Sequence, residues 1–132
     1  MKRKPKLVID ASCILSIIAQ EPAAIDVKNK ASGYELAAPD CLSFEIGNAL
    51  AKLVKRKLFT GEAAVELFNA FKQIPITVKL SSVEDSLQLA CEENHYIYDM
   101  FYLDCALKTG YPLLTLDEKL IQIAKKRGVE CL

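Results

Sequence analysis

The stretch KLVIDAS, residues 6–12, is a short apolar run that ends in a carboxylate, Asp10. Apolar runs of this length, bounded by polar or turn residues, are typical of buried strands. Similar runs occur at residues 35–38, 76–79, 112–114 and 129–131. Longer segments of helical period lie between them. This alternation predicts an α/β fold with a central, mainly parallel sheet of four to five strands.

Helices are expected in the segments between these strands. They cover residues 13–19, 23–30, 42–56, 60–73, 81–93, 97–109 and 118–127. Thr60 is a typical N-cap, as is Ser81 or Ser82, and Gly110 and Gly128 follow the ends of the last two helices. The predicted elements fill the chain without a linker, so we expect one domain over residues 1–132.

Composition excludes several classes of protein. The 132 residues are 52% apolar and carry 17 basic and 17 acidic side chains, whereas a polyanion-coating protein needs a large basic excess. The five glycines are far apart, which excludes the Rossmann fingerprint, the P-loop and the nucleophile elbow. The five cysteines form no C-x-x-C pair. They are therefore expected to be reduced and mostly buried.

The single histidine, His95, cannot build a zinc site of two or three imidazoles within one chain. We expect it to be a surface residue or a helix cap. Asp10 also interrupts the apolar segment near the N-terminus, which opposes export, and no other stretch is long and apolar enough to span a membrane. A cytoplasmic protein without membrane contact is expected.

Two carboxylates follow predicted strands. Asp10 comes after residues 7–9, and Asp117 after residues 113–116. The carboxyl ends of parallel strands meet at one edge of an open α/β sheet, where such folds place their chemistry. Both residues also precede helices, so helix capping remains an alternative for each of them.

Two further acids lie on predicted helices. Glu45 is on the flank of an apolar stripe, which places it at the edge of the core or in a polar cavity. The helix over residues 97–109 is apolar nearly all round, so Asp99 and Asp104 need partners. A spacing of five residues rotates them about 140° apart. Asp99 is assigned to the site, and Asp104 to an i,i+4 ion pair with Lys108.

Together, four acids are expected to converge: Asp10, Glu45, Asp99 and Asp117. Such a cluster repels itself unless a hard divalent cation neutralises it. Oxygen ligands without a nearby imidazole or thiolate favour Mg²⁺ or Mn²⁺. A site of this kind suits phosphodiester hydrolysis.

Four segments around these acids resemble the ordered motifs of PIN-domain proteins, particularly VapC-type toxin ribonucleases. They are VIDAS (8–12), EIGNAL (45–50), YDMFYL (98–103) and LTLDEKL (114–120). The resemblance implies an α/β/α sandwich and a metal-dependent endonuclease that cuts RNA to leave a 5′-phosphate and a 3′-hydroxyl. It also implies a homodimer and, for the toxin branch, a small antitoxin whose tail blocks the site.

The resemblance assigns roles to individual positions. Asp10, Glu45, Asp99 and Asp117 match the family's acidic quartet. Ser12 and Thr115 match hydroxyl side chains that support the metal or its waters, and Asn48 matches a frequent partner on the helix that carries the glutamate. Asp104 departs from the pattern, because small apolar residues are usual at that position.

The leading hypothesis is a Mg²⁺- or Mn²⁺-dependent endoribonuclease acting on single-stranded RNA. In it Asp10, Asp99 and Asp117 hold metal, and Glu45 binds metal or orients the attacking water. Two basic groups could contact the RNA backbone or simply face solvent at helix ends: Lys52, Lys55, Arg56 and Lys57, and Lys125, Lys126 and Arg127. The alternative is a PIN-like binding module with weak or absent catalysis. A receiver-like phosphoacceptor fits poorly, because the acidic pair and strand-end lysine that it needs are missing.

Overall fold

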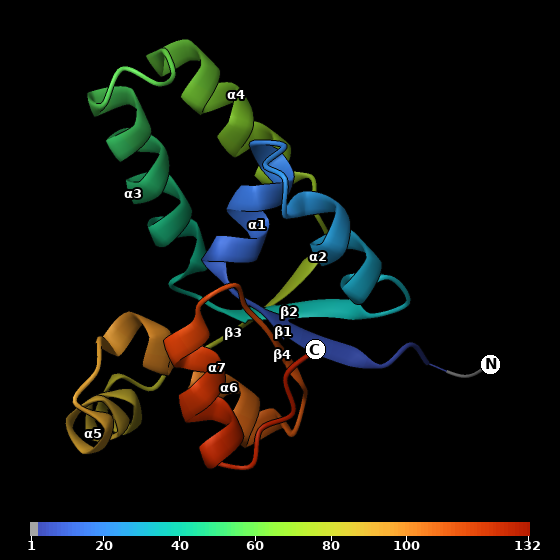
Figure 1. Ribbon diagram of the computed structural model, residues 1–132, viewed down its shortest axis with the longest axis vertical. Helices are drawn as coiled ribbons and strands as arrows, with labels where there is room; N and C mark the ends of the chain where they lie inside the picture. The colour runs from blue at the N-terminus through green and yellow to red at the C-terminus, as the bar shows by residue number, and fades with distance from the viewer. Residues whose placement is uncertain (1–2) are drawn as a thin grey trace.

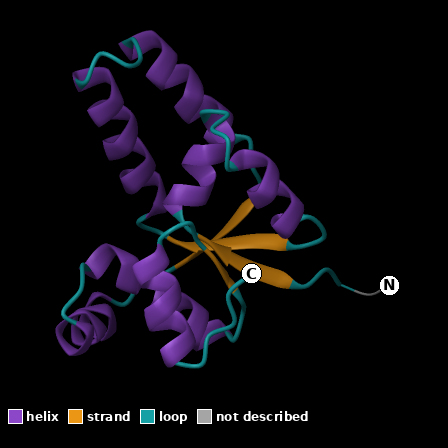
Figure 2. Cartoon of the chain, viewed as in Figure 1, coloured by secondary structure: helices purple, strands orange, loops and turns teal. Residues whose placement is uncertain are grey.

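The computed structural model describes residues 3–132, and over this range the chain alternates strands and helices (Figures 1 and 2). The strands are β1 (Lys6–Ile9), β2 (Glu35–Pro39), β3 (Ile76–Lys79) and β4 (Leu113–Leu114). The helices are α1 (Ala11–Ile18), α2 (Ala24–Ala31), α3 (Leu42–Lys55), α4 (Gly61–Lys72), α5 (Val83–Glu93), α6 (Ile97–Thr109) and α7 (Glu118–Lys126). Residues 1 and 2 lie outside the described part, and the single domain over 1–132 stays a prediction.

The sheet has the order β3-β2-β1-β4, and every pair of neighbouring strands is parallel. Val8 in β1 lies opposite Ala37 on one side and Leu113 on the other. Helices α1 to α4 lie on one side of the sheet, and α5 to α7 lie on the other (Figure 1). The predicted three-layer α/β/α architecture is therefore confirmed.

The strand expected at residues 129–131 is reduced to one bridge, between Leu113 and Cys131. The backbone N–H of Leu113 donates to the carbonyl of Glu130 (2.8 Å), and that of Leu132 donates to the carbonyl of Leu113 (3.1 Å). Because β4 is only two residues long, it offers no further length for pairing.

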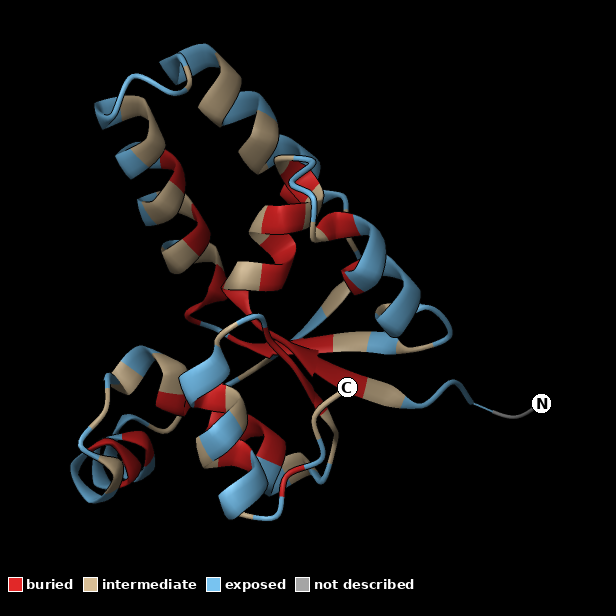
Figure 3. Cartoon of the chain, in the orientation of Figure 1, coloured by how far each residue is buried: buried red, intermediate tan, exposed pale blue. Residues whose placement is uncertain are grey.

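The core lies between the sheet and its two helical layers, with β1 at its centre (Figure 3). Leu7, Val8 and Ile9 are fully buried, as expected for an inner strand covered on both faces. Helix α6 is buried from Met100 to Ala106, which confirms the prediction of a buried helix. None of the helices described over residues 3–132 is long and apolar enough to cross a membrane.

Helix caps explain the observed boundaries. Helix α1 begins two residues earlier than expected because the Asp10 side chain accepts a hydrogen bond from the backbone N–H of Cys13 (3.1 Å). Ser82 caps α5 in the same way, through the N–H of Asp85 (3.2 Å). Gly110 ends α6 with a φ of 74°, a left-handed conformation that glycine adopts without strain.

All five cysteines are free thiols. Cys13, Cys41 and Cys105 are buried, Cys131 is half-buried and Cys91 is exposed. Burial raises the pKa of the Cys41 thiol to about 12 and that of Cys105 to about 11, so both stay protonated at neutral pH. The expectation of mostly buried cysteines is confirmed, and their reduced state stays a prediction.

Candidate metal centre and active site

Asp10 lies where β1 ends and is 5% exposed. Its Oδ1 accepts hydrogen bonds from the Ser12 hydroxyl (2.6 Å) and from the Cys13 N–H, and its Oδ2 accepts one from the Thr115 hydroxyl. Burial raises the pKa of Asp10, while these hydrogen bonds act in the opposite direction. The carboxylate therefore ties the end of β1 to the segment that follows β4.

The Ser12 and Thr115 hydroxyls also contact the loop that carries Asp117. The Ser12 hydroxyl accepts from the N–H of Leu116 (3.1 Å), and the Thr115 hydroxyl accepts from the N–H of Asp117 (3.0 Å). Each hydroxyl thus donates to Asp10 and accepts from the loop that carries Asp117. The two side chains set the position of that loop relative to Asp10.

Asp117 is the N-cap of α7 and accepts from the N–H groups of Lys119 (2.9 Å) and Leu120 (3.2 Å). Both bonds go to Oδ1, so capping does not use Oδ2. The capping alternative is therefore confirmed for Asp117, as it is for Asp10. In neither residue does capping remove the carboxylate from the end of the sheet.

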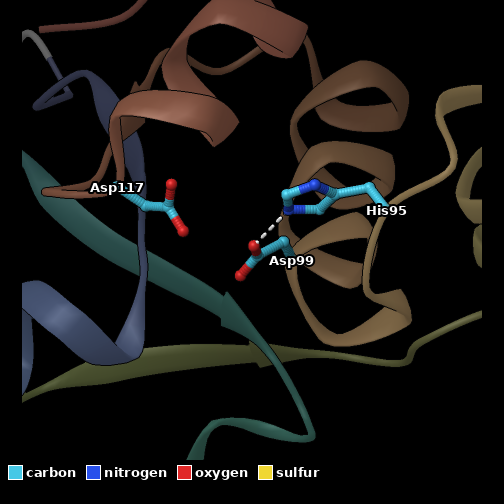
Figure 4. Close-up of side chains that lie close together, drawn as sticks. All are labelled: His95, Asp99 and Asp117. Atoms are coloured by element: carbon cyan, nitrogen blue, oxygen red, sulfur yellow. Dashed lines mark hydrogen bonds and ion pairs between the residues drawn. The ribbon is translucent and has the colours of Figure 1, made fainter.

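Asp99, in the first turn of α6, lies between Asp117 and His95 (Figure 4). The Nε2 atom of His95 is 2.6 Å from Oδ2 of Asp99. One ligand atom each from His95, Asp99 and Asp117 lies within 4.8 Å of the others. Burial raises the pKa of Asp99, the hydrogen bond from His95 lowers it, and the nearby charges of Asp117 and Asp10 raise it.

His95 corrects two expectations. It is not a surface residue or a cap, because its side chain is 9% exposed and pairs with Asp99. The site is also not free of imidazole, which was the premise for oxygen-only ligation. The sequence held a usable signal: His95 and Asp99 are four residues apart at the start of a helix, a spacing that brings side chains together.

Glu45, on α3, is half-buried and faces α6. Its Oε1 accepts from the Tyr102 hydroxyl (2.7 Å) and lies 3.4 Å from the Cys41 thiol, which donates to it. Burial raises the pKa of Glu45, and the charges of Asp99 and Asp10 raise it further against these two hydrogen bonds. A carboxylate on the flank of the core is thus directed into a polar setting.

The four predicted acids gather in one region but not at one point. Within residues 3–132, the set that shares the 4.8 Å limit contains Asp99 and Asp117 with His95, and not Asp10 or Glu45. Asp10 and Glu45 are coupled to Asp99 through their charges. The structure therefore has a tight pair of carboxylates with two further carboxylates nearby.

A groove of about 590 Å³ lies beside Glu45. Its walls include Phe44, Asn48 and Lys52 from α3 and Tyr98 from α6. Phe44 is 77% exposed and Tyr98 is 54% exposed, so both rings are accessible at the groove. Asn48, one turn after Glu45, contributes to the groove wall.

The two basic groups differ in their surroundings. Lys52 lines the groove next to Glu45. In the second group, Lys126 and Arg127 pair with Glu93, and Arg127 also pairs with Glu92 (2.8 Å). These ion pairs join α7 to α5, which favours a structural role for this second group.

Asp104 is set apart from the site. Its Oδ2 is 3.0 Å from the Lys108 ammonium, which also contacts Asp85 (2.6 Å). The predicted i,i+4 ion pair is confirmed, and Asp104 faces α5 rather than Asp99.

The residues present fit a divalent cation. Two carboxylates and an imidazole can reach a common point, and two more carboxylates add negative charge around it. Burial is the main cause of the raised pKa of Asp99, and the charges of Asp117 and Asp10 add to it; a bound cation would relieve the repulsion between these carboxylates. Carboxylate oxygens suit Mg²⁺ and Mn²⁺.

Comparisons with known proteins agree with this fold. Residues 7–126 match the family described as PIN domain. The ribonuclease VapC12 of Mycobacterium tuberculosis is 26% identical over 118 residues, which cover 88% of this chain and 90% of VapC12. The chain therefore belongs to the PIN domain family, and its resemblance to VapC-type proteins is confirmed.

Solved structures share the fold. The crystal structure of PAE2754 from Pyrobaculum aerophilum superposes with a TM-score of 0.75 at 24% identity, covering 96% of this chain and 83% of the other. VapBC2 from Rickettsia felis, solved bound to a DNA fragment from their promoter, has a TM-score of 0.66 at 12% identity and 96% coverage of both chains.

Proposed function

We propose that this protein is a metal-dependent endoribonuclease that hydrolyses phosphodiester bonds in single-stranded RNA, and that it is the toxin of a toxin–antitoxin pair. The observation that carries the proposal is the meeting of Asp99, Asp117 and His95 within 4.8 Å at the edge of the sheet, where Glu45 of the same acidic region lines a groove. Membership of the PIN domain family and similarity to the ribonuclease VapC12 support it.

The metal in this proposal is Mg²⁺ or Mn²⁺, and the catalytic and metal-binding residues are Asp10, Glu45, Asp99 and Asp117. Asp99 and Asp117 are the primary ligands because their oxygens can reach a common point. A bound cation would supply an activated water and offset the charge that develops on the phosphate. Both oxygens of Asp10 accept hydrogen bonds, so Asp10 can bind the metal only if one of these hydrogen bonds is replaced by a bond to the cation.

Glu45 orients the attacking water in this proposal. Its Oε1 is occupied by the Tyr102 and Cys41 hydrogen bonds, which leaves Oε2 as the atom that would accept a proton. A raised pKa suits a carboxylate to accept a proton near neutral pH. Ser12 and Thr115 support the site by positioning Asp10 and the Asp117 loop, and Asn48 supports it from the groove wall.

The groove beside Glu45 is the proposed RNA channel. Exposed Phe44 and Tyr98 offer faces on which bases can stack, and Lys52 offers a charge for a phosphate. Single-stranded RNA exposes its bases for stacking, whereas a duplex does not. These features favour a single-stranded substrate.

The proposed partners are an antitoxin protein and a second copy of the chain, in the cytoplasm. The fold shared with VapBC2 and the VapC resemblance support the antitoxin. Three apolar side chains at the open β3 edge and the start of α5 support the homodimer: Val78, Leu80 and Val83, which are 65%, 92% and 61% exposed. Leu80→Lys should lower the molar mass measured by light scattering from that of a dimer to that of a monomer.

Cleavage of a mixed RNA pool with Mn²⁺ and with a chelator tests the function. We expect cuts with Mn²⁺ that leave 5′-phosphates, and no cuts with the chelator. Metal binding without any cleavage would instead favour a PIN-like binding module.

A further inference from the structure

His95 occupies a fixed position in the turn between α5 and α6. Asn94 ends α5 in the left-handed conformation, with a φ of 49°. The backbone N–H of His95 then donates to the carbonyl of Ala90 (3.0 Å), and α6 begins two residues later. The backbone before Asp99 is therefore held by the end of another helix.

Packing also fixes the position of the His95 imidazole. Its side chain is 9% exposed and its ring packs edge to face against Tyr96, with ring centroids 5.6 Å apart. From this position Nε2 lies 2.6 Å from Oδ2 of Asp99, within the range of a strong hydrogen bond to a carboxylate. Figure 4 shows the imidazole on the side of Asp99 that is opposite Asp117.

Asp99 needs such a partner. Its carboxylate faces two like charges, Asp117 and Asp10, and its side chain is 24% exposed. Repulsion and solvation would both favour a rotamer turned away from Asp117. A hydrogen bond to Oδ2 opposes that rotation and leaves Oδ1 uncommitted.

We propose that His95 is a positioning residue for the metal centre: its Nε2–H holds Oδ2 of Asp99, so that the Asp99 carboxylate meets a divalent cation together with Asp117. This role rests on the proposed function, because it concerns the same metal site. Partners that orient ligands contribute about 10- to 100-fold to metal affinity. Direct ligation by Nε2 is the competing arrangement, and it would require the hydrogen bond to Asp99 to break.

Mn²⁺ binding by isothermal calorimetry tests this role without any measurement of RNA cleavage. His95→Phe keeps an aromatic ring against Tyr96 but removes the donor, and His95→Ala removes both. His95→Gln keeps an N–H donor of similar reach. Cys91→Ser, at an exposed position of α5, is the matched control.

We expect the Mn²⁺ Kd to rise about 10- to 100-fold in His95→Phe and His95→Ala. It should stay within about threefold of the wild-type value in His95→Gln and Cys91→Ser. Circular dichroism of the metal-free variants checks that each is folded. If His95→Phe or His95→Ala does not fold, the other donor-free variant and His95→Gln still decide the comparison.

Three results would overturn the role. The first is wild-type affinity in a folded donor-free variant, and the second is a loss in His95→Gln as large as in His95→Phe. The third is a ¹⁴N coupling of a directly bound imidazole in the electron paramagnetic resonance of the Mn²⁺ complex. All three would leave the ribonuclease proposal standing, whereas absence of Mn²⁺ binding by the wild type would contradict the metal site itself.

Discussion

The Tyr102 hydroxyl donates a 2.7 Å hydrogen bond to Oε1 of Glu45, although the two residues are 57 positions apart. Tyr102 is 1% exposed and lies on α6, whereas Glu45 lies on α3 across the end of the sheet. The bond gives the half-buried carboxylate a buried partner and directs it toward Asp99 and Asp10. It therefore joins the packing of the core to the geometry of the site.

Tyr102→Phe removes this donor while keeping the ring. We expect the free energy of unfolding at pH 7 to fall by about 1–2 kcal/mol, because a desolvated carboxylate loses a hydrogen bond. Urea denaturation measures the change. Tyr98→Phe, at a half-exposed position of the same helix, is the control and should be close to neutral. Equal effects of the two substitutions would contradict the importance of the Glu45 contact.

Asp10→Asn separates two properties of the buried carboxylate: its effect on the stability of the metal-free protein and its contribution to metal binding. Burial raises the pKa of Asp10, so the charged form is disfavoured in the folded protein. Without divalent ions the variant should therefore melt at a higher temperature than the wild type, by roughly 4 °C per 1 kcal/mol gained. The rise in Tm on adding Mn²⁺ should be smaller in the variant, because a ligand that binds the folded state stabilises it.

Thermal unfolding in chelator and in Mn²⁺ gives both values for Asp10→Asn. Asp26→Asn, in a surface ion pair with Lys30 (3.3 Å), is the control and should change neither. A lower Tm for metal-free Asp10→Asn would show that the hydrogen bonds to this carboxylate outweigh its desolvation.

Phe44→Ala and Lys52→Ala test the RNA groove. Loss of one stacking face should weaken binding of single-stranded RNA by about 1–3 kcal/mol. Loss of one phosphate contact should reduce the slope of log K against log salt by about 0.7. Fluorescence anisotropy with a labelled RNA at several salt concentrations measures both.

Leu58→Ala and Lys28→Ala, at exposed positions away from the groove, are the matched controls for the RNA measurements. Binding that is equally weakened by Phe44→Ala and Leu58→Ala would place the RNA elsewhere on the surface.

Glu93→Gln tests the link between α5 and α7. Hydrogen bonds from Lys126 and Arg127 lower the pKa of Glu93 below its ordinary value of 4.5. A carboxyl group whose pKa is lower in the folded state stabilises the fold above its unfolded pKa, and this stabilisation is lost as the pH falls through the folded pKa. The wild type should therefore melt at a higher temperature than Glu93→Gln at pH 7, and the gap should close below pH 4.5.

Glu66→Gln, at an exposed position of α4, is the control for this pH series and should show little difference from the wild type at any pH. A gap between wild type and Glu93→Gln that is constant with pH would mean that packing, rather than charge, explains the effect.

The parts of the fold that depend on local pattern could be predicted from the sequence. Apolar runs placed the strands β1 to β4, and the position of Asp10 and Asp117 after two of them placed both acids at one edge of the sheet. The ion pair of Asp104 with Lys108 followed from an i,i+4 spacing. The run at residues 129–131 forms one bridge to β4 instead of a fifth strand, because β4 is itself only two residues long.

Contacts between distant elements could not be predicted in this way. Nothing near Glu45 in the sequence indicates that Tyr102 is its partner, because the pairing depends on how α3 and α6 pack. His95 differs from this case. Composition alone does not indicate the role of a single histidine, whereas the spacing of four residues between His95 and Asp99 does.

Cleavage of single-stranded RNA in the presence of Mn²⁺ by Asp99→Asn and Asp104→Asn tests the central claim most directly. The two acids share one helix, but Asp99 faces Asp117 and Asp104 is paired with Lys108. With both variants folded by circular dichroism, we predict that Asp99→Asn abolishes cleavage and that Asp104→Asn retains it. Undiminished cleavage by Asp99→Asn would contradict the assignment of this site.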